Sequence, residues 1–137
     1  MRGTTAVLKR GAMAGSLLQV AQHAEDLDRA VVFYEQLLGQ QVAARFDPPG
    51  LAFFVLGDTR LLLDTGAPSA LIYLRVDDVA AAIERLRGEG VEVVAEPHVI
   101  FRHDDATLGP AGNDELMAFV RDSEGNLVGL VSLVPVD

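Results

Sequence analysis

Apolar and polar positions follow helical spacing in two separate stretches of the chain. Apolar or small residues follow Asp26 at positions 27, 30, 31, 34, 37 and 38, which predicts a helix that begins behind an aspartate N-cap. The same spacing follows Asp78 at positions 79, 82, 83 and 86. Equivalent positions of the two stretches share a single offset of 52 residues. The pattern therefore predicts an internal repeat.

Short apolar runs around each helix predict strands. In both halves one strand precedes the helix and three follow it, with a hairpin as the last pair. Gly39 is expected to end the first helix, and Gly88 or Gly90 the second. The expected strands are 17–22, 41–45, 52–56 and 60–64 in the first half, and 71–76, 91–95, 116–121 and 127–133 in the second.

The repeat predicts an α+β domain over residues 16–137, built from two tandem βαβββ modules at 17–66 and 70–134. Since each module has one helix to cover one sheet face, we expect a curved mixed sheet around a cup, with the helices on the convex face. The cup is the expected ligand site. Residues 101–112, rich in Asp, Gly and Pro, are expected to form a loop over its mouth. Residues 1–15 are expected to form a flexible leader.

Composition excludes several kinds of function. The 137 residues include 11 basic and 20 acidic side chains, for a net charge of -9, which argues against nucleic acid and anionic membranes as partners. The absence of cysteine excludes disulfides, zinc ribbons, iron–sulfur ligation and a catalytic thiol. No apolar run approaches the roughly 20 residues of a membrane span. We therefore expect a cytoplasmic protein.

Three segments together resemble the vicinal oxygen chelate superfamily of glyoxalases, bleomycin-resistance proteins and extradiol dioxygenases. They are residues 19–39, 74–82 and 117–127, in the order and at the spacing of that superfamily. A closer subgroup is similar at Glu96-Pro97-His98 and, less well, at residues 113–117, where either Asp114 or Glu115 fills its acidic position.

The resemblance implies where a metal would be held. In similar metalloenzymes the ligands come from the first and last strands of each module, which correspond here to Gln19, Leu62, Leu71 and Gly129. Only Gln19 has a donor side chain, whereas a divalent cation needs three or four donors. We therefore expect no metal and no cofactor.

Strand alternation selects the side chains that face the cup. Phe53 and Phe54 are adjacent, so only one of them faces the cup, and we take that to be Phe54. Gln19 and Tyr73 are expected to project into the same cavity. The expected ligand-binding residues are Gln19, Phe54, Leu62, Leu71, Tyr73, His98, Glu115 and Gly129.

Three polar side chains have an alternative structural interpretation. Arg75 is expected to pair with Asp77 or Asp78 rather than to bind a ligand. His98 is either a proton donor or acceptor at the site, or a residue that caps a loop. Gln19 is either a ligand contact or a satisfied polar group at a strand edge.

These features predict a protein that binds a small molecule in the cup without a metal, similar to drug-binding resistance proteins. The net negative charge favours a cationic ligand. The alternative is a metal-dependent lyase, isomerase or dioxygenase with an unusual site built from Gln19, His98 and Glu115, with His103 as a further candidate. In similar proteins two chains pair and cover their sheet edges, so the resemblance implies a homodimer.

Overall fold

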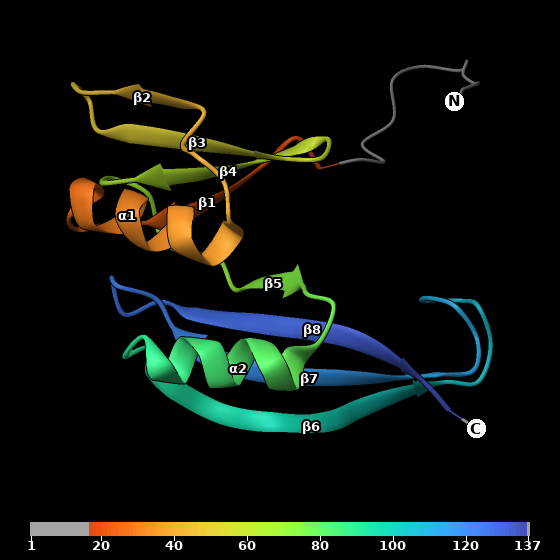
Figure 1. Ribbon diagram of the computed structural model, residues 1–137. Helices are drawn as coiled ribbons and strands as arrows, with labels where there is room; N and C mark the ends of the chain where they lie inside the picture. Colours follow the sequence, from red (N-terminus) through yellow and green to blue (C-terminus); the bar gives the residue numbers. More distant parts are fainter. Residues whose placement is uncertain (1–16, 137) are drawn as a thin grey trace, which may run out of the picture.

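The protein is described by a computed structural model over residues 17–136, and it has the predicted α+β fold (Figure 1). The expected leader lies outside the described residues. The elements in chain order are β1 (Gln19–His23), α1 (Leu27–Leu38), β2 (Ala44–Phe46), β3 (Leu51–Leu56), β4 (Thr59–Asp64), β5 (Ile72–Arg75), α2 (Val79–Gly88), β6 (Val93–His103), β7 (Asn113–Arg121) and β8 (Leu127–Pro135). Each half of the chain is thus one βαβββ module.

Both helices begin where the sequence predicts. The Asp26 carboxylate accepts a hydrogen bond from the backbone N–H of Arg29 at 3.0 Å, and the Asp78 carboxylate accepts one from Ala81 at 3.1 Å. Each bond satisfies an N–H that has no partner inside the helix. Gly39 ends α1 in the left-handed conformation, with φ 68°, which a glycine adopts without steric cost.

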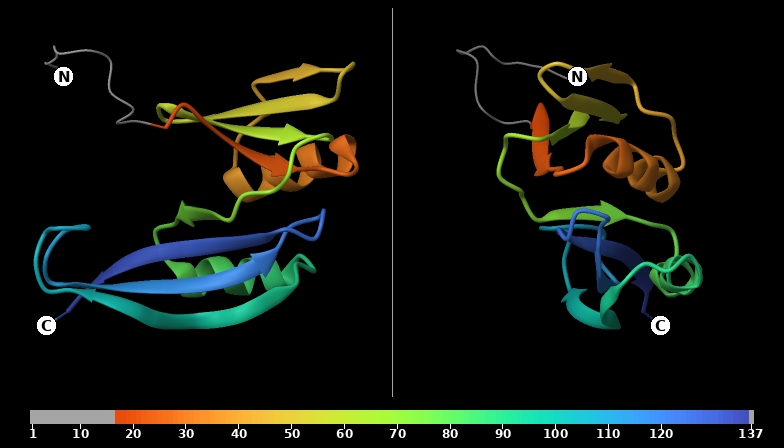
Figure 2. Two further views of the ribbon diagram at one scale, coloured as in Figure 1. Left: turned by 180° about the vertical axis from the view of Figure 1, so that it is seen from behind. Right: turned by 90° about the vertical axis from the view of Figure 1, so that its left-hand side faces the viewer.

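The eight strands are divided between two four-stranded sheets. Their orders are β1-β4-β3-β2 and β5-β8-β7-β6. β1 pairs with β4 in parallel, and β5 pairs with β8 in parallel, while all the other strand pairs are antiparallel. Within residues 17–136 no ladder joins β1 to β5, so the two modules do not share one continuous sheet. Figure 2 shows the two sheets from behind and from the side.

The core lies on the helix side of both sheets. In the first module Tyr34 of α1 packs near Phe54 of β3, with 6.4 Å between ring centroids, and Leu61 and Leu63 of β4 are buried beside them. The second module contributes a matching set from α2, β7 and β8, which includes Ile83, Ala118, Val120, Val128 and Leu130. None of the helices in the described part of the chain is long and apolar enough to cross a membrane.

A hydrogen-bonded joint holds the two modules together. The Tyr34 hydroxyl donates to Asp122 in the β7–β8 turn at 2.7 Å, and the Asn126 side-chain amide donates to the carbonyl oxygen of His23 at 2.8 Å. At the same joint the half-exposed Arg29 pairs with the buried carboxylate of Glu124 at 2.7 Å. Most of the first sheet lies on the far side of α1 from the second module (Figure 1).

The position of α1 decides how the cup faces are oriented. α1 covers one face of the first sheet and α2 the corresponding face of the second (Figure 2), and Gln19 lies on the face opposite α1. Gln19 is not among the residues that line the cavity beside Tyr73. That the two side chains contact one bound molecule stays a prediction.

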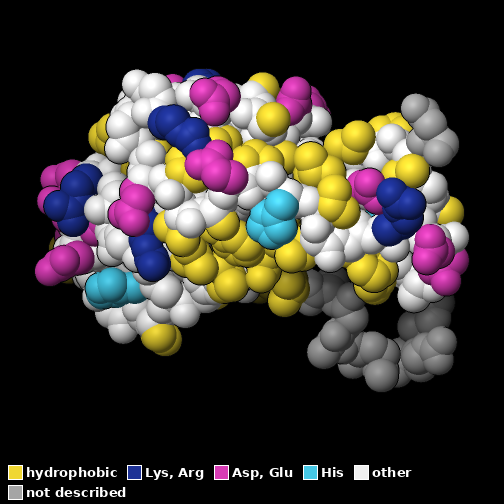
Figure 3. Space-filling model, turned by 90° about the horizontal axis from the view of Figure 1, so that it is seen from below, with side chains coloured by type: hydrophobic (Ala, Val, Ile, Leu, Met, Phe, Trp, Pro, Cys, Tyr) yellow, Lys and Arg dark blue, Asp and Glu magenta, His cyan; other side chains and the backbone are white. Residues whose placement is uncertain are grey.

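Strand β6 is much longer than predicted. It continues past residue 95 to His103, because Phe101 pairs with Glu115 and His103 with Asn113 in spite of three register shifts. The connecting loop therefore starts at residue 104 instead of 101. β6 also forms an edge of its sheet, and Val99, Ile100 and Phe101 are each about half exposed along it. Figure 3 shows this side of the molecule, where hydrophobic side chains gather around one histidine.

Candidate functional site

A cavity of about 320 Å³ lies on the cup face of the second sheet. Strands β5, β7 and β8 form its floor, and the loop of residues 104–112 contributes the remaining wall. We call it the loop-covered cavity. It is lined by Tyr73, Arg75, Leu108, Gly109, Pro110, Glu115, Met117, Val131 and Leu133.

Strand register brings the floor residues onto one face. Residues directly opposite each other in adjacent strands share a face, and Glu115 is opposite Leu133 while Met117 is opposite Val131. Alternation then places Tyr73 on the same side, since Tyr73 and Phe119 are both opposite Gly129.

Tyr73 lies across a position that has no side chain. A Cβ atom built at Gly129 would come within 2.6 Å of the ring, closer than real contacts allow. The ring also meets Phe119 edge to face, with 5.9 Å between centroids. Tyr73 remains 52% exposed, so its outer surface is available to a bound molecule.

The loop is fastened to the strands around it. The Gly112 N–H donates to the carbonyl oxygen of His103 at 2.8 Å, and the Asn113 amide donates to the carbonyl oxygen of Pro110 at 3.1 Å. A Cβ atom at Gly109 would lie 3.1 Å from the His103 ring. The loop therefore packs directly on His103, as predicted for a segment that folds over the cup.

His103 and Glu115 form a pair at the cavity wall. His103 is 2% exposed, and its Nε2 lies 2.9 Å from Oε1 of Glu115. The Phe101 ring meets the imidazole edge to face at 4.8 Å. Nδ1 of His103 is buried with no hydrogen-bond partner. Both residues are candidates from the sequence, but no sequence spacing joins them, because their contact depends on the β6–β7 register.

Glu115, rather than Asp114, is the acidic residue of the cavity. Asp114 projects from the other face of β7 and forms an ion pair with Arg102 at 2.8 Å. That contact holds the pKa of Asp114 below its ordinary value.

On the cup face of the first sheet the polar side chains bind each other. Gln19 accepts a hydrogen bond from Arg60 at 3.1 Å, and the Arg60 guanidinium lies 5.6 Å from the centre of the Phe53 ring. The side chain of Gln19 faces the cup side as predicted, but its carbonyl oxygen already has a partner.

Phe54 does not face the cup. It is fully buried in the core under α1, and Phe53 occupies the cup face instead. The ladder explains the orientation, because Phe54 is opposite Leu61 on the helix side while Phe53 is opposite Leu62. The prediction of Phe54 as a ligand contact is wrong.

The remaining predicted residues are scattered. Leu71 is exposed just before β5, and His98 is exposed on β6 with its Nδ1 2.8 Å from the carbonyl oxygen of Glu96. Arg75 lines the loop-covered cavity, and within the described residues it forms no ion pair. Its expected pairing with Asp77 or Asp78 is wrong, since the Asp78 carboxylate caps α2.

The residues at the family's metal positions do not fit a metal ion. Leu62 is apolar and 7% exposed, Gly129 is covered by the Tyr73 ring, and Gln19 is bonded to Arg60. Across residues 17–136 no group of three His, Asp or Glu side chains is arranged to hold a metal. The unusual site expected from Gln19, His98 and Glu115 is not assembled either.

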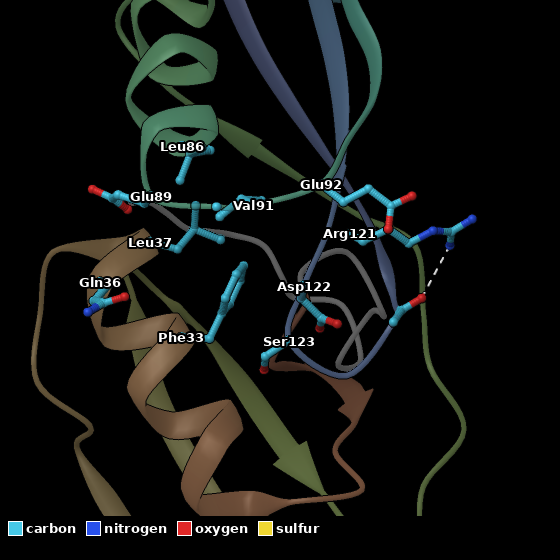
Figure 4. Close-up of a pocket in the computed structure, with 12 residues that line it drawn as sticks. Phe33, Gln36, Leu37, Leu86, Glu89, Val91, Glu92, Arg121, Asp122 and Ser123 are labelled. Atoms are coloured by element: carbon cyan, nitrogen blue, oxygen red, sulfur yellow. Dashed lines mark hydrogen bonds between the residues drawn. The ribbon is translucent and has the colours of Figure 1, made fainter.

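A larger hollow of about 470 Å³ lies between the modules (Figure 4). Phe33 and Leu37 of α1 line it together with Leu86 of α2, and Asp122 points toward it. The Asp122 carboxylate, however, accepts hydrogen bonds from the Tyr34 hydroxyl, the Asn126 amide and two backbone N–H groups. Burial and the adjacent Asp122 raise the pKa of Tyr34. These groups hold the modules together, so this hollow is the weaker candidate.

Comparisons with known proteins agree with this architecture. Among solved structures, a lactoylglutathione lyase from Agrobacterium tumefaciens is 24% identical, with a TM-score of 0.64 over 86% of this chain and 93% of that chain. An integron cassette protein from the mobile metagenome of V. cholerae is 19% identical, with a TM-score of 0.65 over 88% and 97%. A glyoxalase I mutant from Zea mays is 20% identical, with a TM-score of 0.61 over 88% and 45%.

These likenesses are all under 25% identity and establish the fold alone. None of the curated proteins compared with the chain matches it significantly. A family match covers residues 16–130 and is described as Glyoxalase/Bleomycin resistance protein/Dioxygenase superfamily. This match confirms the resemblance seen in the sequence: the chain belongs to the glyoxalase/bleomycin resistance protein/dioxygenase superfamily.

Proposed function

We propose that the protein binds a small organic molecule in the loop-covered cavity without a metal ion. The observation that carries this proposal is the pairing of an apolar floor with polar groups at its rim. Met117, Val131 and Leu133 offer apolar surface, while Glu115 and Arg75 offer charge. Concave sites of this composition are typical of ligand binding.

The volume limits what fits. About 320 Å³ is at the lower end of ligand pockets, which run from roughly 300 to 1,000 Å³. A compact molecule, or one end of a longer molecule, fits such a space. The net charge of -9 adds a long-range field that attracts cations at low salt.

Calorimetric titration tests the proposal directly. The probes are small amphipathic cations, matched neutral amphiphiles and basic glycopeptides, each added to the untagged protein. We expect saturable binding of at least one compact amphiphile, with a negative heat-capacity change from apolar burial. Absence of binding by every probe at millimolar concentration would reject a binding function for this cavity.

A metal-dependent reaction remains a separate alternative that elemental analysis decides. The protein is purified without chelator or affinity tag and its transition-metal content is measured. Leu62 and Gly129 have no donor side chain and Gln19 is bonded to Arg60. We therefore expect less than about a tenth of an equivalent of metal per chain. A stoichiometric metal would contradict the metal-free proposal and support the lyase, isomerase or dioxygenase alternative.

We also propose that two chains pair as a homodimer. β6 is an unpaired sheet edge with Val99, Ile100 and Phe101 about half exposed. A second copy presents the same edge, and a twofold axis makes such a surface complementary to itself. Light scattering at micromolar concentration should give about twice the chain mass of 14.6 kDa; the mass of a single chain would contradict it.

A further inference from the structure

The buried His103–Glu115 pair has a chemical asymmetry. The imidazole makes one hydrogen bond, from Nε2 to Glu115, and its other nitrogen has no partner. Burying a polar atom without a partner costs free energy, and burying an N–H or a charge in that state costs more than burying a lone pair. The arrangement is therefore least costly when Nδ1 carries no proton.

The tautomer fixes the state of Glu115. If Nδ1 is bare, the proton of the neutral imidazole is on Nε2, so His103 donates to Glu115. Glu115 then acts as the acceptor, which is the role of an ionised carboxylate. One of its oxygens is taken by His103, and the side chain as a whole remains 25% exposed and lines the cavity.

The surroundings offer this carboxylate no cation within hydrogen-bonding distance among the described residues. Arg102 pairs with Asp114 on the other face of β7. Arg75 lines the same cavity without forming an ion pair. Glu115 thus presents a negatively charged acceptor at the edge of an apolar floor.

We propose that Glu115, positioned by His103, receives the ammonium group of a compact amphiphilic amine whose apolar part lies on Met117, Val131 and Tyr73. This inference rests on the proposed function and names its ligand class. A charge-assisted hydrogen bond to a partly buried carboxylate is stronger than a neutral one. Gly109 completes the arrangement, because its lack of a side chain lets the loop close on the imidazole.

Two probes of nearly equal shape isolate the contribution of the ligand's charge to its affinity. 2-Phenylethylamine carries an ammonium group at neutral pH, and 2-phenylethanol carries a hydroxyl at the same place. Calorimetry on the full chain should show the amine binding about tenfold more tightly than the alcohol. Glu115→Gln should reduce this preference to about one while leaving the affinity for the alcohol nearly unchanged.

The matched control changes the same charge on the neighbouring residue. Asp114→Asn removes a carboxylate from the opposite face of β7, so it alters the net charge equally without touching the cavity. It should keep the preference for the amine. Arg75→Gln removes a like charge from the cavity and should tighten amine binding about twofold.

His103 is tested as a positioning residue by the ratio of the two affinities, which a loss of stability alone does not change. His103→Leu removes the donor and should lower the preference for the amine several-fold. His103→Gln restores an N–H donor of similar reach and should recover most of it. Equal ratios in these two variants would overturn the positioning role.

The outcomes separate this inference from the proposed function. Equal binding of amine and alcohol, or a preference that survives Glu115→Gln, overturns the assignment of Glu115 while small-molecule binding stands. Loss of the preference in Asp114→Asn as well would show that net charge, and not the cavity, selects the amine, and would also overturn it. Binding of neither probe at millimolar concentration overturns the ligand class inferred here, whereas the proposed function is rejected only if every probe of the wider calorimetric series also fails to bind.

Discussion

The two modules share a repeat but differ in the element that follows the helix. In the first module β2 has three residues and a short connection, 47–50, leads into β3. In the second module the equivalent strand, β6, has eleven residues and is followed by the loop 104–112. The longer loop is what supplies Leu108, Gly109 and Pro110 to the wall of the cavity on the second cup face.

The polar groups of the two cup faces differ in the same way. On the first face Gln19 and Arg60 bond to each other, and Arg60 lies over Phe53. On the second face Arg75 has no ion-pair partner among the described residues, and Glu115 is bonded only on the side of His103. The first face is thus internally satisfied, whereas the second retains groups that can meet a ligand.

The largest expected effect separates the two sides of the first sheet. Phe54→Ala should lower the free energy of unfolding by about 3–5 kcal/mol, because it empties a fully buried site. Phe53→Ala, from the partly exposed cup face, should cost roughly 1 kcal/mol. Urea unfolding of both variants measures the difference, and equal losses would contradict the assignment of the faces.

The joint between the modules gives the next effect. Tyr34→Phe removes the hydroxyl that donates to Asp122 at 2.7 Å and leaves a buried carboxylate short of one partner. We expect a loss of about 1–3 kcal/mol in the free energy of unfolding. Tyr73→Phe is the matched control, since its hydroxyl belongs to a half-exposed ring, and it should change stability by less than about 0.5 kcal/mol.

Truncating Tyr73, on the cup face of the second sheet, should weaken ligand binding more than it lowers the stability of the fold. Tyr73→Ala removes a ring that is 52% exposed, and the expected loss of affinity for a bound amphiphile is about 1–3 kcal/mol. Stability and affinity are measured on the same preparation. A large stability loss with unchanged affinity in the folded fraction would show that Tyr73 serves packing alone.

The smallest expected effect is a dependence of the melting temperature on pH. The ion pair with Arg102 lowers the pKa of Asp114 from its ordinary value of 3.8, so its contribution to stability is present above that value and is lost as pH falls through the lowered pKa. Wild type and Asp114→Asn should therefore differ slightly in melting temperature at pH 6 and converge near pH 2. A difference that persists at pH 2 would assign it to something other than this ion pair.

Local sequence signals predicted the elements well. Asp26 and Asp78 cap their helices as expected, and the Gly57-Asp58 turn joins β3 to β4. These features depend on residues a few positions apart, which is why the sequence alone reveals them. The predictions of a homodimer, of a cytoplasmic location and of ligand contacts at Gln19, Tyr73 and His98 stay predictions.

Apart from the local pairing expected for Arg75, the errors concern longer-range relations. Phe53 and Phe54 are adjacent and chemically identical, so the sequence does not indicate which of them faces the core. Packing of the strand under α1 decides it. The length of β6 depends on register shifts against β7, which a local pattern does not contain. The same register creates the contact of His103 with Glu115.

The contact between Tyr73 and Gly129 also constrains how this chain can change by mutation. Any side chain at 129 would strike the ring at 2.6 Å, so a ligand-type residue at the family's last-strand position is incompatible with the tyrosine. A metal donor at position 129 therefore also needs the Tyr73 ring to be moved or replaced by a smaller residue. Leu62 requires a third replacement. Positions 73 and 129 are therefore epistatic, because the effect of any side chain at 129 depends on which residue stands at 73.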